Sequence, residues 1–395
     1  MATNNFSYGL DSKNGTSKPP ITTTTTTSTS NGTPINNWTH PGPAAFDFRS
    51  DTITTPTASM LASITSTTLL DDVFLEDTTT NSLDAFIASL TGHAASLLVM
   101  SGTMGNQIAL RTHLQGPPHA VLCDYRAHIL EWEAGGTASL CGALVKGVVP
   151  SNGVYLTLED VRKNAVISDD VHACPTRVIS LENTLGGTIM PLSEARRICE
   201  WAAEHGILTH LDGARIWEAA AATPNPTETL KAFCETFDSV SLCYSKGLGA
   251  PIGSSLVGNE TFIKRARWIR KSIGGGIRMS GIIAAAARTA VEETFLGGKL
   301  AESHERARYV AGLWEQRGGK LALGVETNMV WLDIAAAGVQ TEEWVGMARE
   351  EGLNVLGGRL VVHYQVCDEA IGRLESVMDR ALKRGTKRSA EETEG

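Results

Sequence analysis

From about residue 46, short apolar or β-branched runs alternate with stretches of helical periodicity, and this alternation constrains the fold more than any other feature. Strands are predicted over residues 95–99, 178–181, 206–211 and 239–243. Helical stretches such as 106–114 and 193–205 lie between them, the second with Ser193 as its expected N-cap. Strand, polar loop and helix in repetition predict an α/β fold in which helices cover a mostly parallel sheet.

The two ends of the chain depart from this pattern. Residues 1–45 include a threonine run at 22–27 and few aliphatic side chains, so we expect a disordered tail that cannot bury enough apolar surface to order. Residues 46–295 are expected to form a large domain and residues 296–385 a small C-terminal α/β domain. In the small domain we predict helices over 302–317, 342–351 and 368–384, strands over 327–332 and 358–364, and a charged tail over 386–395.

Composition limits the classes of partner. The net charge of −9 leaves no large basic surface, so we expect no nucleic-acid partner. No run of about 18 uncharged apolar residues and no secretory signal stand in the sequence, so we expect a cytoplasmic protein without a membrane partner. The 7 cysteines include no Cys-x-x-Cys pair. We therefore expect the cysteines to be buried free thiols, and we expect no bound metal.

Polar residues stand where three predicted strands end, and parallel sheets bind ligands beyond their carboxyl ends. Ser101-Gly102-Thr103 opens a helix whose first amides suit a phosphate. Asp212 could pair with a protonated ring nitrogen. Lys246 lies in apolar, glycine-rich surroundings, where an amine can attack an aldehyde. Phosphate site, carboxylate and lysine in this order are what pyridoxal 5'-phosphate requires.

Each of these elements has a simpler interpretation when taken alone. Ser-Gly-Thr before a helix is usually only a cap, Asp-Gly is most often a turn, and a lysine in a glycine-rich loop is usually solvated. Phosphate-loop, zinc-protease and serine-hydrolase motifs are absent from the sequence. Residues 247–253 come near a dinucleotide fingerprint, but the glycine spacing is one residue too long and Pro251 disfavours the following helix.

A larger set of motifs resembles the threonine aldolase family, one of the fold-type I pyridoxal-phosphate enzymes related to β-eliminating lyases. These motifs are Phe48-Arg49-Ser50-Asp51-Thr52, Asp71-Asp72-Val73-Phe74, Ser101-Gly102-Thr103-Met104-Gly105-Asn106, Asp124-Tyr125-Arg126-Ala127-His128, Ser180-Leu181-Glu182-Asn183-Thr184, His210-Leu211-Asp212-Gly213-Ala214-Arg215, residues 245–251, Gly274-Gly275-Gly276-Ile277-Arg278 and Gly357-Gly358-Arg359. They span about residues 46–380, and fungal members, including fungal alanine racemases, look most similar.

The resemblance implies a fold-type I α/β architecture. A large domain with a mostly parallel seven-stranded sheet would bind pyridoxal 5'-phosphate, followed by the small C-terminal α/β domain. It also implies a small-molecule amino-acid substrate and a homotetramer built as a dimer of dimers, in which Arg278 would serve a neighbouring subunit's site.

The family's site residues carry over onto matching positions. Lys246 would be the Schiff-base lysine, Asp212 would pair with the pyridine nitrogen, Arg215 would lie near the phenolic oxygen, and His128 would stack on the ring. The phosphate would be held mostly through backbone amides, by Gly102, Thr103 and Met104.

The substrate's α-carboxylate would be bound by Ser50 and Arg359, the latter as a bidentate fork. The implied reaction is retro-aldol cleavage of L-threonine, L-allo-threonine or a related β-hydroxy-α-amino acid to glycine and an aldehyde. His128 or a bound water would act as the base. Glu133 and Glu182 are either neighbours that support these groups or structural carboxylates.

Several positions depart from the family pattern. Leu185 stands where many bacterial members have a histidine, and Phe74 where many have a tyrosine. Leu75 and Thr78 replace the usual glycine and proline, and Met279 replaces a glutamine. These last positions are expected near the substrate entrance, so they leave the β-substituent of the substrate open.

Two other functions remain open at this level. An amino-acid racemase of a fungal cyclic-peptide pathway, on the same scaffold, would break the Cα–H bond instead, with Lys246 acting on one face. A non-catalytic assembly protein is the third possibility. The joint presence of Lys246, Asp212, Arg215 and Arg359 argues against it.

Overall fold

The computed structural model describes the backbone of residues 36–394 and the side chains of residues 36–384. Most of the tail expected to be disordered therefore lies outside the described residues. Its end is ordered, because the short 3₁₀ helix η1 (Gly42–Phe46) buries Ala44 and Ala45. Residues from Trp38 onward form one compact unit.

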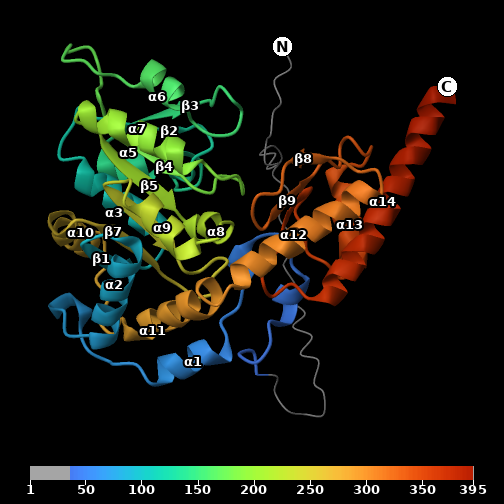
Figure 1. Cartoon of the computed structure of the whole chain (residues 1–395), viewed down its shortest axis with the longest axis horizontal. Coiled ribbons are helices and arrows are strands. Elements are labelled where there is room, and N and C mark those ends of the chain that lie inside the picture. Colours follow the sequence, from blue (N-terminus) through green and yellow to red (C-terminus); the bar gives the residue numbers. More distant parts are fainter. Residues whose placement is uncertain (1–35, 395) are drawn as a thin grey trace, which may run out of the picture. The chain divides into compact units, whose positions relative to one another are not determined.

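A seven-stranded sheet with the order β1-β7-β6-β5-β4-β2-β3 organises the larger part of this unit (Figure 1). Its strands are β1 (Ala95–Val99), β2 (Ala120–Asp124), β3 (Leu144–Val148), β4 (Thr176–Glu182), β5 (Leu208–Gly213), β6 (Ser239–Cys243) and β7 (Ser254–Gly258). Five neighbouring strands, in the order β3-β2-β4-β5-β6, are parallel. Strand β7 runs antiparallel to both β6 and β1. The mostly parallel seven-stranded sheet is thus confirmed.

Helices and short helical turns precede, connect and follow these strands. They are η2 (Asp51–Ile53), α1 (Ala58–Thr65), η3 (Asp72–Phe74), α2 (Thr78–Thr91), α3 (Gly102–His113), α4 (His128–Glu131), α5 (Gly136–Cys141), α6 (Leu158–Asn164), α7 (Leu192–Glu204), α8 (Ile216–Ala221), α9 (Pro226–Cys234), α10 (Glu260–Ser272), α11 (Gly281–Ala290) and the π-helical turn η4 (Val291–Phe295). None of the helices within residues 36–394 combines the length and the apolar character needed to cross a bilayer.

Alternate side chains of the strands point to opposite faces of the sheet, and each face has its own helices. In β1, Leu97 and Val99 belong to an apolar cluster with side chains of α3 and α10, whereas Leu98 belongs to the cluster of the other face, which includes side chains of α2, α7, α9 and α11. Register places Asp212 of β5 between Glu182 of β4 and Ser241 of β6. Carboxyl ends of these parallel strands therefore meet at one edge, as expected for a ligand site.

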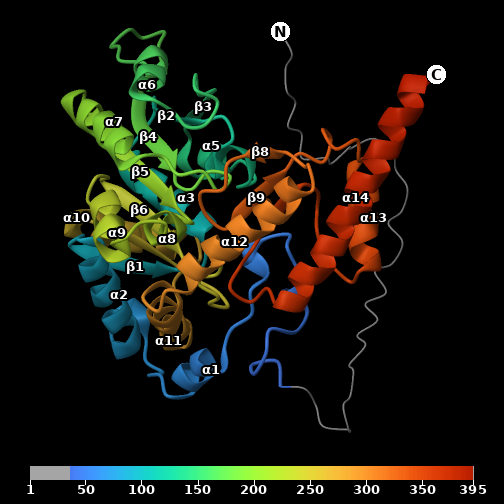
Figure 2. The same ribbon diagram turned by 45° about the vertical axis from the view of Figure 1, so that its right-hand side comes forward.

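The C-terminal part has a separate apolar cluster and a small antiparallel sheet of order β10-β9-β8. Its elements are α12 (Lys299–Gln316), β8 (Leu321–Leu323), β9 (Met329–Leu332), α13 (Thr341–Glu350), β10 (Arg359–Val361) and α14 (Asp368–Glu394) (Figure 2). Phe48 lies in this cluster, and its amide donates to the Asn354 carbonyl. We propose the boundary between the two domains near residue 296, where the sequence pattern changes.

Several expected ends were wrong: α12 begins at Lys299 and not at residue 302, and β9 and β10 are shorter than the expected 327–332 and 358–364. Two helix ends differ for a clear structural reason. Helix α7 begins at Leu192, because the Pro191 carbonyl already accepts from the Glu194 and Ala195 amides, so Ser193 lies inside the helix and does not cap it. Helix α14 continues through Glu394, so the backbone of the expected charged tail is helical.

Candidate active site

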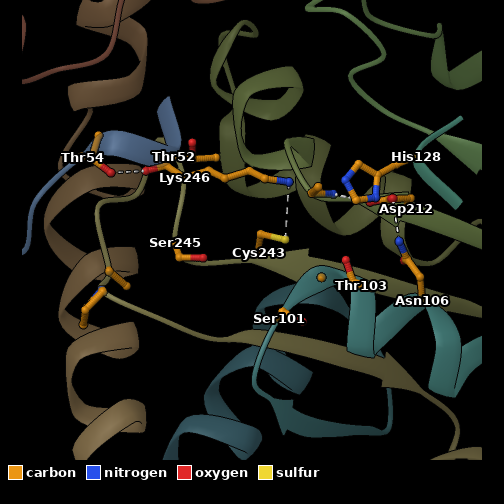
Figure 3. Close-up of a pocket in the computed structure, with 14 residues that line it drawn as sticks. Thr52, Thr54, Ser101, Thr103, Asn106, His128, Asp212, Cys243, Ser245 and Lys246 are labelled. Atoms are coloured by element: carbon orange, nitrogen blue, oxygen red, sulfur yellow. Dashed lines mark hydrogen bonds between the residues drawn. The ribbon is translucent and has the colours of Figure 1, made fainter. Parts of the chain in front are cut away.

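A cavity of about 340 Å³ opens where β5, β6 and the start of α3 meet (Figure 3). It is lined by Thr52, Thr54, Ser101, Gly102, Thr103, Asn106, His128, Asp212, Ala214, Cys243, Ser245, Lys246, Ala250 and Pro251. Five of the nine site residues expected from the sequence are in this lining, namely Gly102, Thr103, His128, Asp212 and Lys246. The volume falls in the range of ordinary cofactor and small-ligand pockets.

The first turn of α3 forms one wall. The Ser101 hydroxyl caps the helix by accepting from the Met104 amide at 3.1 Å, so this amide is used within the helix start. The amides of Gly102 and Thr103 belong to the first turn and have no acceptor inside the helix, which makes them an anion site. A Cβ on Gly102 would lie 2.6 Å from Cys243 Sγ, so glycine lets the helix approach β6.

A chain of hydrogen bonds forms the opposite wall. The Asn106 amide nitrogen donates to Asp212 Oδ2 at 2.7 Å and to Glu133 Oε1 at 2.8 Å. Glu133 Oε1 in turn hydrogen-bonds His128 Nδ1 at 2.9 Å, and its other oxygen accepts from Gln107 at 2.5 Å. Asp212 and Glu133 are buried, so these bonds hold the carboxylates in one orientation.

Hydrogen bonds through His210 to Ser239 fix the orientation of the Asn106 side chain. Its Oδ1 lies 3.1 Å from His210 Nε2, and His210 Nδ1 lies 2.9 Å from the Ser239 hydroxyl. Burial lowers the pKa of His210 to about 3, so the ring is neutral and donates from one nitrogen only. With Nε2–H donating to Asn106 Oδ1, the Asn106 NH₂ group must face the two carboxylates.

Three acceptor-bearing side chains meet here, and ligand atoms of His128, Glu133 and Asp212 lie within 4.8 Å of one another. Such a group could hold a metal ion. Asn106 already places an NH₂ group between the two carboxylates, so their close approach is explained by hydrogen bonding without an ion.

The electrostatics of this wall favour a charged His128 and a neutral Glu182. The hydrogen bond that His128 Nδ1 donates to Glu133 is the main cause that raises the pKa of His128. Burial, together with the negative charge of Asp212, raises the pKa of Glu182 to about 8, and Glu182 accepts from the His128 amide at 2.9 Å. A raised pKa favours the protonated form of Glu182, which limits repulsion with Asp212.

Lys246 follows β6 and is held differently. Its carbonyl accepts from the Thr54 hydroxyl at 2.8 Å and from the Gly249 amide at 2.9 Å, which fixes the backbone. Its Nζ makes a single long contact, 3.7 Å to Cys243 Sγ, within the described part of the chain. The amine therefore reaches the cavity on an anchored backbone but remains free to turn.

Arg215 lies beside the cavity, where it forms a bidentate pair with Asp51. Nε lies 2.8 Å from Oδ2 and Nη2 lies 2.6 Å from Oδ1. Burial alone would raise the pKa of Asp51, but the adjacent Arg215 guanidinium lowers it to about 2. The pair joins the first residue of η2 to the turn after β5.

Ser50, Arg359 and Arg278 do not reach the cavity lining. The Ser50 hydroxyl accepts from the Thr52 amide at 3.2 Å and caps η2. Arg359 Nη2 donates to the Arg49 carbonyl at 2.9 Å. Arg278 is exposed and pairs with Asp71 at 2.9 Å. The first two remain near the segment that carries Thr52 and Thr54, and Arg278 lies on the surface.

Two departures from the family pattern are backbone positions rather than substrate contacts. Leu75 has a φ of 62°, a left-handed conformation that favours glycine, which explains the usual glycine there. Thr78 is the first residue of α2, where proline is favoured. Neither Leu75 nor Met279 lines the cavity, and both side chains are exposed.

Sequence reasoning missed several residues of the site. Asn106 lies one turn after Thr103 on α3, and this helical spacing is the signal that could have placed it in the same wall. Thr52 ends the Phe48–Thr52 motif and Thr54 lies two residues beyond it, but both come from a segment nearly two hundred positions before Lys246, so their place in the cavity depends on the fold.

Comparisons with known proteins find relatives over most of the chain. The chain is 58% identical over 351 residues to Aldolase vrtJ of Penicillium aethiopicum, covering 89% of this chain and 90% of that protein. It is 45% identical over 340 residues to the low specificity L-threonine aldolase of Saccharomyces cerevisiae, covering 86% and 87%. It is also 42% identical over 352 residues to Alanine racemase TOXG of Cochliobolus carbonum, covering 88% and 90%.

Among solved structures, the threonine aldolase of Leishmania major superposes with a TM-score of 0.72 at 19% identity, covering 85% of this chain and 99% of that chain. This likeness confirms the expected fold-type I architecture. The model of the family described as beta-eliminating lyase matches residues 47–337. With relatives of this identity aligned over most of its length, the chain belongs to the beta-eliminating lyase family and is a relative of the fungal threonine aldolases.

Proposed function

We propose that this protein is a pyridoxal 5'-phosphate-dependent aldolase. It cleaves L-threonine, L-allo-threonine or a related β-hydroxy-α-amino acid to glycine and an aldehyde. The observation that carries this proposal is the meeting of Lys246, Asp212 and the start of α3 in one cavity. Relatives named as an aldolase and as an L-threonine aldolase, at 58% and 45% identity, support the same reaction.

The donor set of the cavity fits the cofactor. The amides of Gly102 and Thr103 suit a phosphate, Asp212 suits a protonated ring nitrogen, and the Lys246 amine suits an aldehyde carbon. A Cβ on Gly102 would lie 2.6 Å from Cys243 Sγ, so glycine at this position lets the first turn of α3 approach β6 at the edge of the cavity. When bound, pyridoxal phosphate supplies an aldehyde that takes an amine and a ring that accepts the electron pair of a bond broken at Cα.

The protein's residues then divide the remaining work. Asp212, held by Asn106 and the Ala214 amide, would keep a proton on the ring nitrogen and favour negative charge developing in the ring. His128 carries Glu133 on Nδ1, so Nε2 is the atom that would exchange a proton with the β-hydroxyl. Arg359 and Ser50, whose side chains contact the segment next to Thr52, would bind the α-carboxylate of the substrate.

A second function is an amino-acid racemase, and the specific observation that favours it is the 42% identity to Alanine racemase TOXG. A racemase would move a proton at Cα, with Lys246 Nζ as the acid or base on one face. The aldolase is preferred because the relative with 58% identity is named as an aldolase.

The test separates the two reactions on purified protein supplied with pyridoxal phosphate. Incubation with L-threonine should release acetaldehyde, and incubation with L-alanine should yield no D-alanine. Formation of D-alanine without release of acetaldehyde would mean that the protein is a racemase and not an aldolase. Lys246→Ala should abolish turnover, by roughly 10³-fold or more, and a variant that retains turnover would mean that another lysine does the work.

We further infer a cytoplasmic homotetramer, built as a dimer of dimers, as the resemblance implies. The absence of any membrane-spanning helix among residues 36–394 is compatible with this compartment. Light scattering on the purified protein should report four times the chain mass of 42.1 kDa. A monomer that retains activity would refute the assembly.

A further inference from the structure

The cavity wall contains a thiol that the proposed reaction does not use. Cys243 Sγ lies 3.7 Å from Lys246 Nζ and accepts a hydrogen bond from the Ser254 hydroxyl at 3.3 Å. Figure 3 shows the lysine side chain extending over the sulfur, with the dashed contact joining amine and thiol. A thiol and a primary amine therefore lie close together in the lining of one cavity.

Other buried thiols have no such setting. Burial raises the pKa of Cys123 and of Cys199 to about 12, so both remain protonated and unreactive near neutral pH. Both lie in apolar clusters of the core rather than in the cavity lining. These two cysteines provide internal controls for the reactivity of Cys243.

We propose that Cys243 and Lys246 form a covalent modification site, in which an oxidant of the peroxide class causes the two side chains to join. Hydrogen peroxide transfers one oxygen to Sγ, its O–O bond breaks, water leaves, and the thiol becomes a sulfenic acid. Nζ then attacks the sulfur, the S–O bond breaks, and a second water leaves with one proton from the amine. The product is a sulfur–nitrogen bond, and the two side chains have lost two hydrogens in total.

The geometry suits this closure. Cys243 is fixed in β6 opposite Ser254 of β7, and the Lys246 backbone is anchored through its carbonyl. Only the lysine side chain must move to shorten the 3.7 Å gap, and its amine has no other hydrogen bond in the described part of the chain. Because the two residues are three positions apart, closing the ring orders few additional bonds.

The consequence rests on the proposed function, although the covalent site itself does not. An amine bonded to sulfur cannot bond an aldehyde carbon, so the cross-link would prevent cofactor loading. Bound cofactor would in turn occupy the amine and protect the pair. The site would therefore distinguish protein without cofactor from loaded protein under oxidising conditions.

The experiment treats cofactor-free and pyridoxal-phosphate-saturated protein with hydrogen peroxide, digests both with trypsin and maps peptides by mass spectrometry. In the cofactor-free sample we expect a peptide that contains both residues, is uncut after Lys246 and lacks two hydrogens. Dithiothreitol should restore the mass and the cleavage. The saturated sample should show the unmodified pair.

Three controls make the result decisive. Cys243→Ser should show no loss of hydrogen, whereas Lys246→Arg should leave Cys243 gaining oxygen instead. The partly exposed Cys174 and Cys367 should gain oxygen in every sample, which verifies the oxidation. If Cys243 gains only oxygen in the unaltered protein, joins another cysteine, or stays unmodified while Cys174 and Cys367 react, the proposal is wrong. None of these readouts depends on aldolase activity.

Discussion

The two sides of the cavity hold their polar groups in opposite ways. On one side Asp212, Asn106, Glu133 and His128 form an unbroken chain of hydrogen bonds between 2.7 and 2.9 Å. On the other side the Lys246 amine makes one contact of 3.7 Å to a thiol. The hydrogen-bonded side chains are therefore held in place, whereas the Lys246 amine can move.

This difference matches the demands of the proposed chemistry. A carboxylate that stabilises developing charge works best when it needs no reorganisation. A lysine that must leave and return to a reacting carbon cannot be tied into strong hydrogen bonds. The same contrast exposes Lys246 to reaction with Cys243, while the opposite wall has no mobile nucleophile among the residues described.

The largest effect is expected from Asp212→Asn, which keeps the shape of the fixed wall and removes its charge. An amide cannot hold a ring nitrogen in its protonated state, so kcat for threonine cleavage should fall by roughly 10²- to 10³-fold. Acetaldehyde release measures this directly. A loss below tenfold would mean that the fixed wall supports structure more than chemistry.

The next effect concerns stability. Asp51→Asn leaves the Arg215 guanidinium, only 17% exposed, without its counter-charge, and should cost about 3–5 kcal/mol of unfolding free energy at pH 7. The folded pKa of Asp51, about 2, lies below the ordinary 3.8, so its stabilisation is full above pH 3.8 and is lost as the pH falls through 2.

Denaturant unfolding at pH 7 and pH 2.5 tests this sign, because the gap between the two proteins should shrink in acid. The double change Asp51→Asn with Arg215→Met should recover part of the loss by removing the stranded charge. A gap that widens in acid would contradict the assignment.

A smaller effect tests the link between Glu133 and His128. Glu133→Gln removes the main cause of the raised pKa of His128, so this pKa should fall, as measured by NMR titration of cofactor-free protein. A raised folded pKa contributes stability below the ordinary 6.5 that is lost as the pH rises through the folded value. The variant should therefore lose more stability at pH 5.5 than at pH 8. Glu131→Gln is the matched control, because Glu131 is an exposed glutamate on α4, the short helix that begins at His128. It should leave the titration of His128 unchanged.

The smallest effect concerns the start of α3. Gly102→Ala would place a Cβ 2.6 Å from Cys243 Sγ, so the helix or the thiol must shift. Affinity for pyridoxal phosphate should weaken roughly tenfold, and adding Cys243→Ala should restore it. Gly116→Ala, which meets open space, should have no effect. Failure of the second change to rescue would place the strain elsewhere.

Much of the fold and part of the site followed from sequence pattern. Strands β1 and β6 have the predicted bounds, because short β-branched runs between polar loops are locally specified. Arg359 and Ser50 could be proposed only by resemblance, and in the structure their side chains bond to neighbouring backbone groups. Helix ends were less predictable, since Pro191 and the long α14 depend on which carbonyls find donors.

The order of Ser101, Asp212 and Lys246 along the chain was sufficient to place them together, because carboxyl ends of parallel strands share one edge of a sheet. The sequence alone also carried the family, through motifs spread from residue 46 to residue 380. Tertiary structure alone decided that Asn106 joins Asp212 to Glu133 and that Arg215 turns to Asp51, 164 positions away. Such contacts depend on distances and directions between side chains, which form only when distant segments pack against each other.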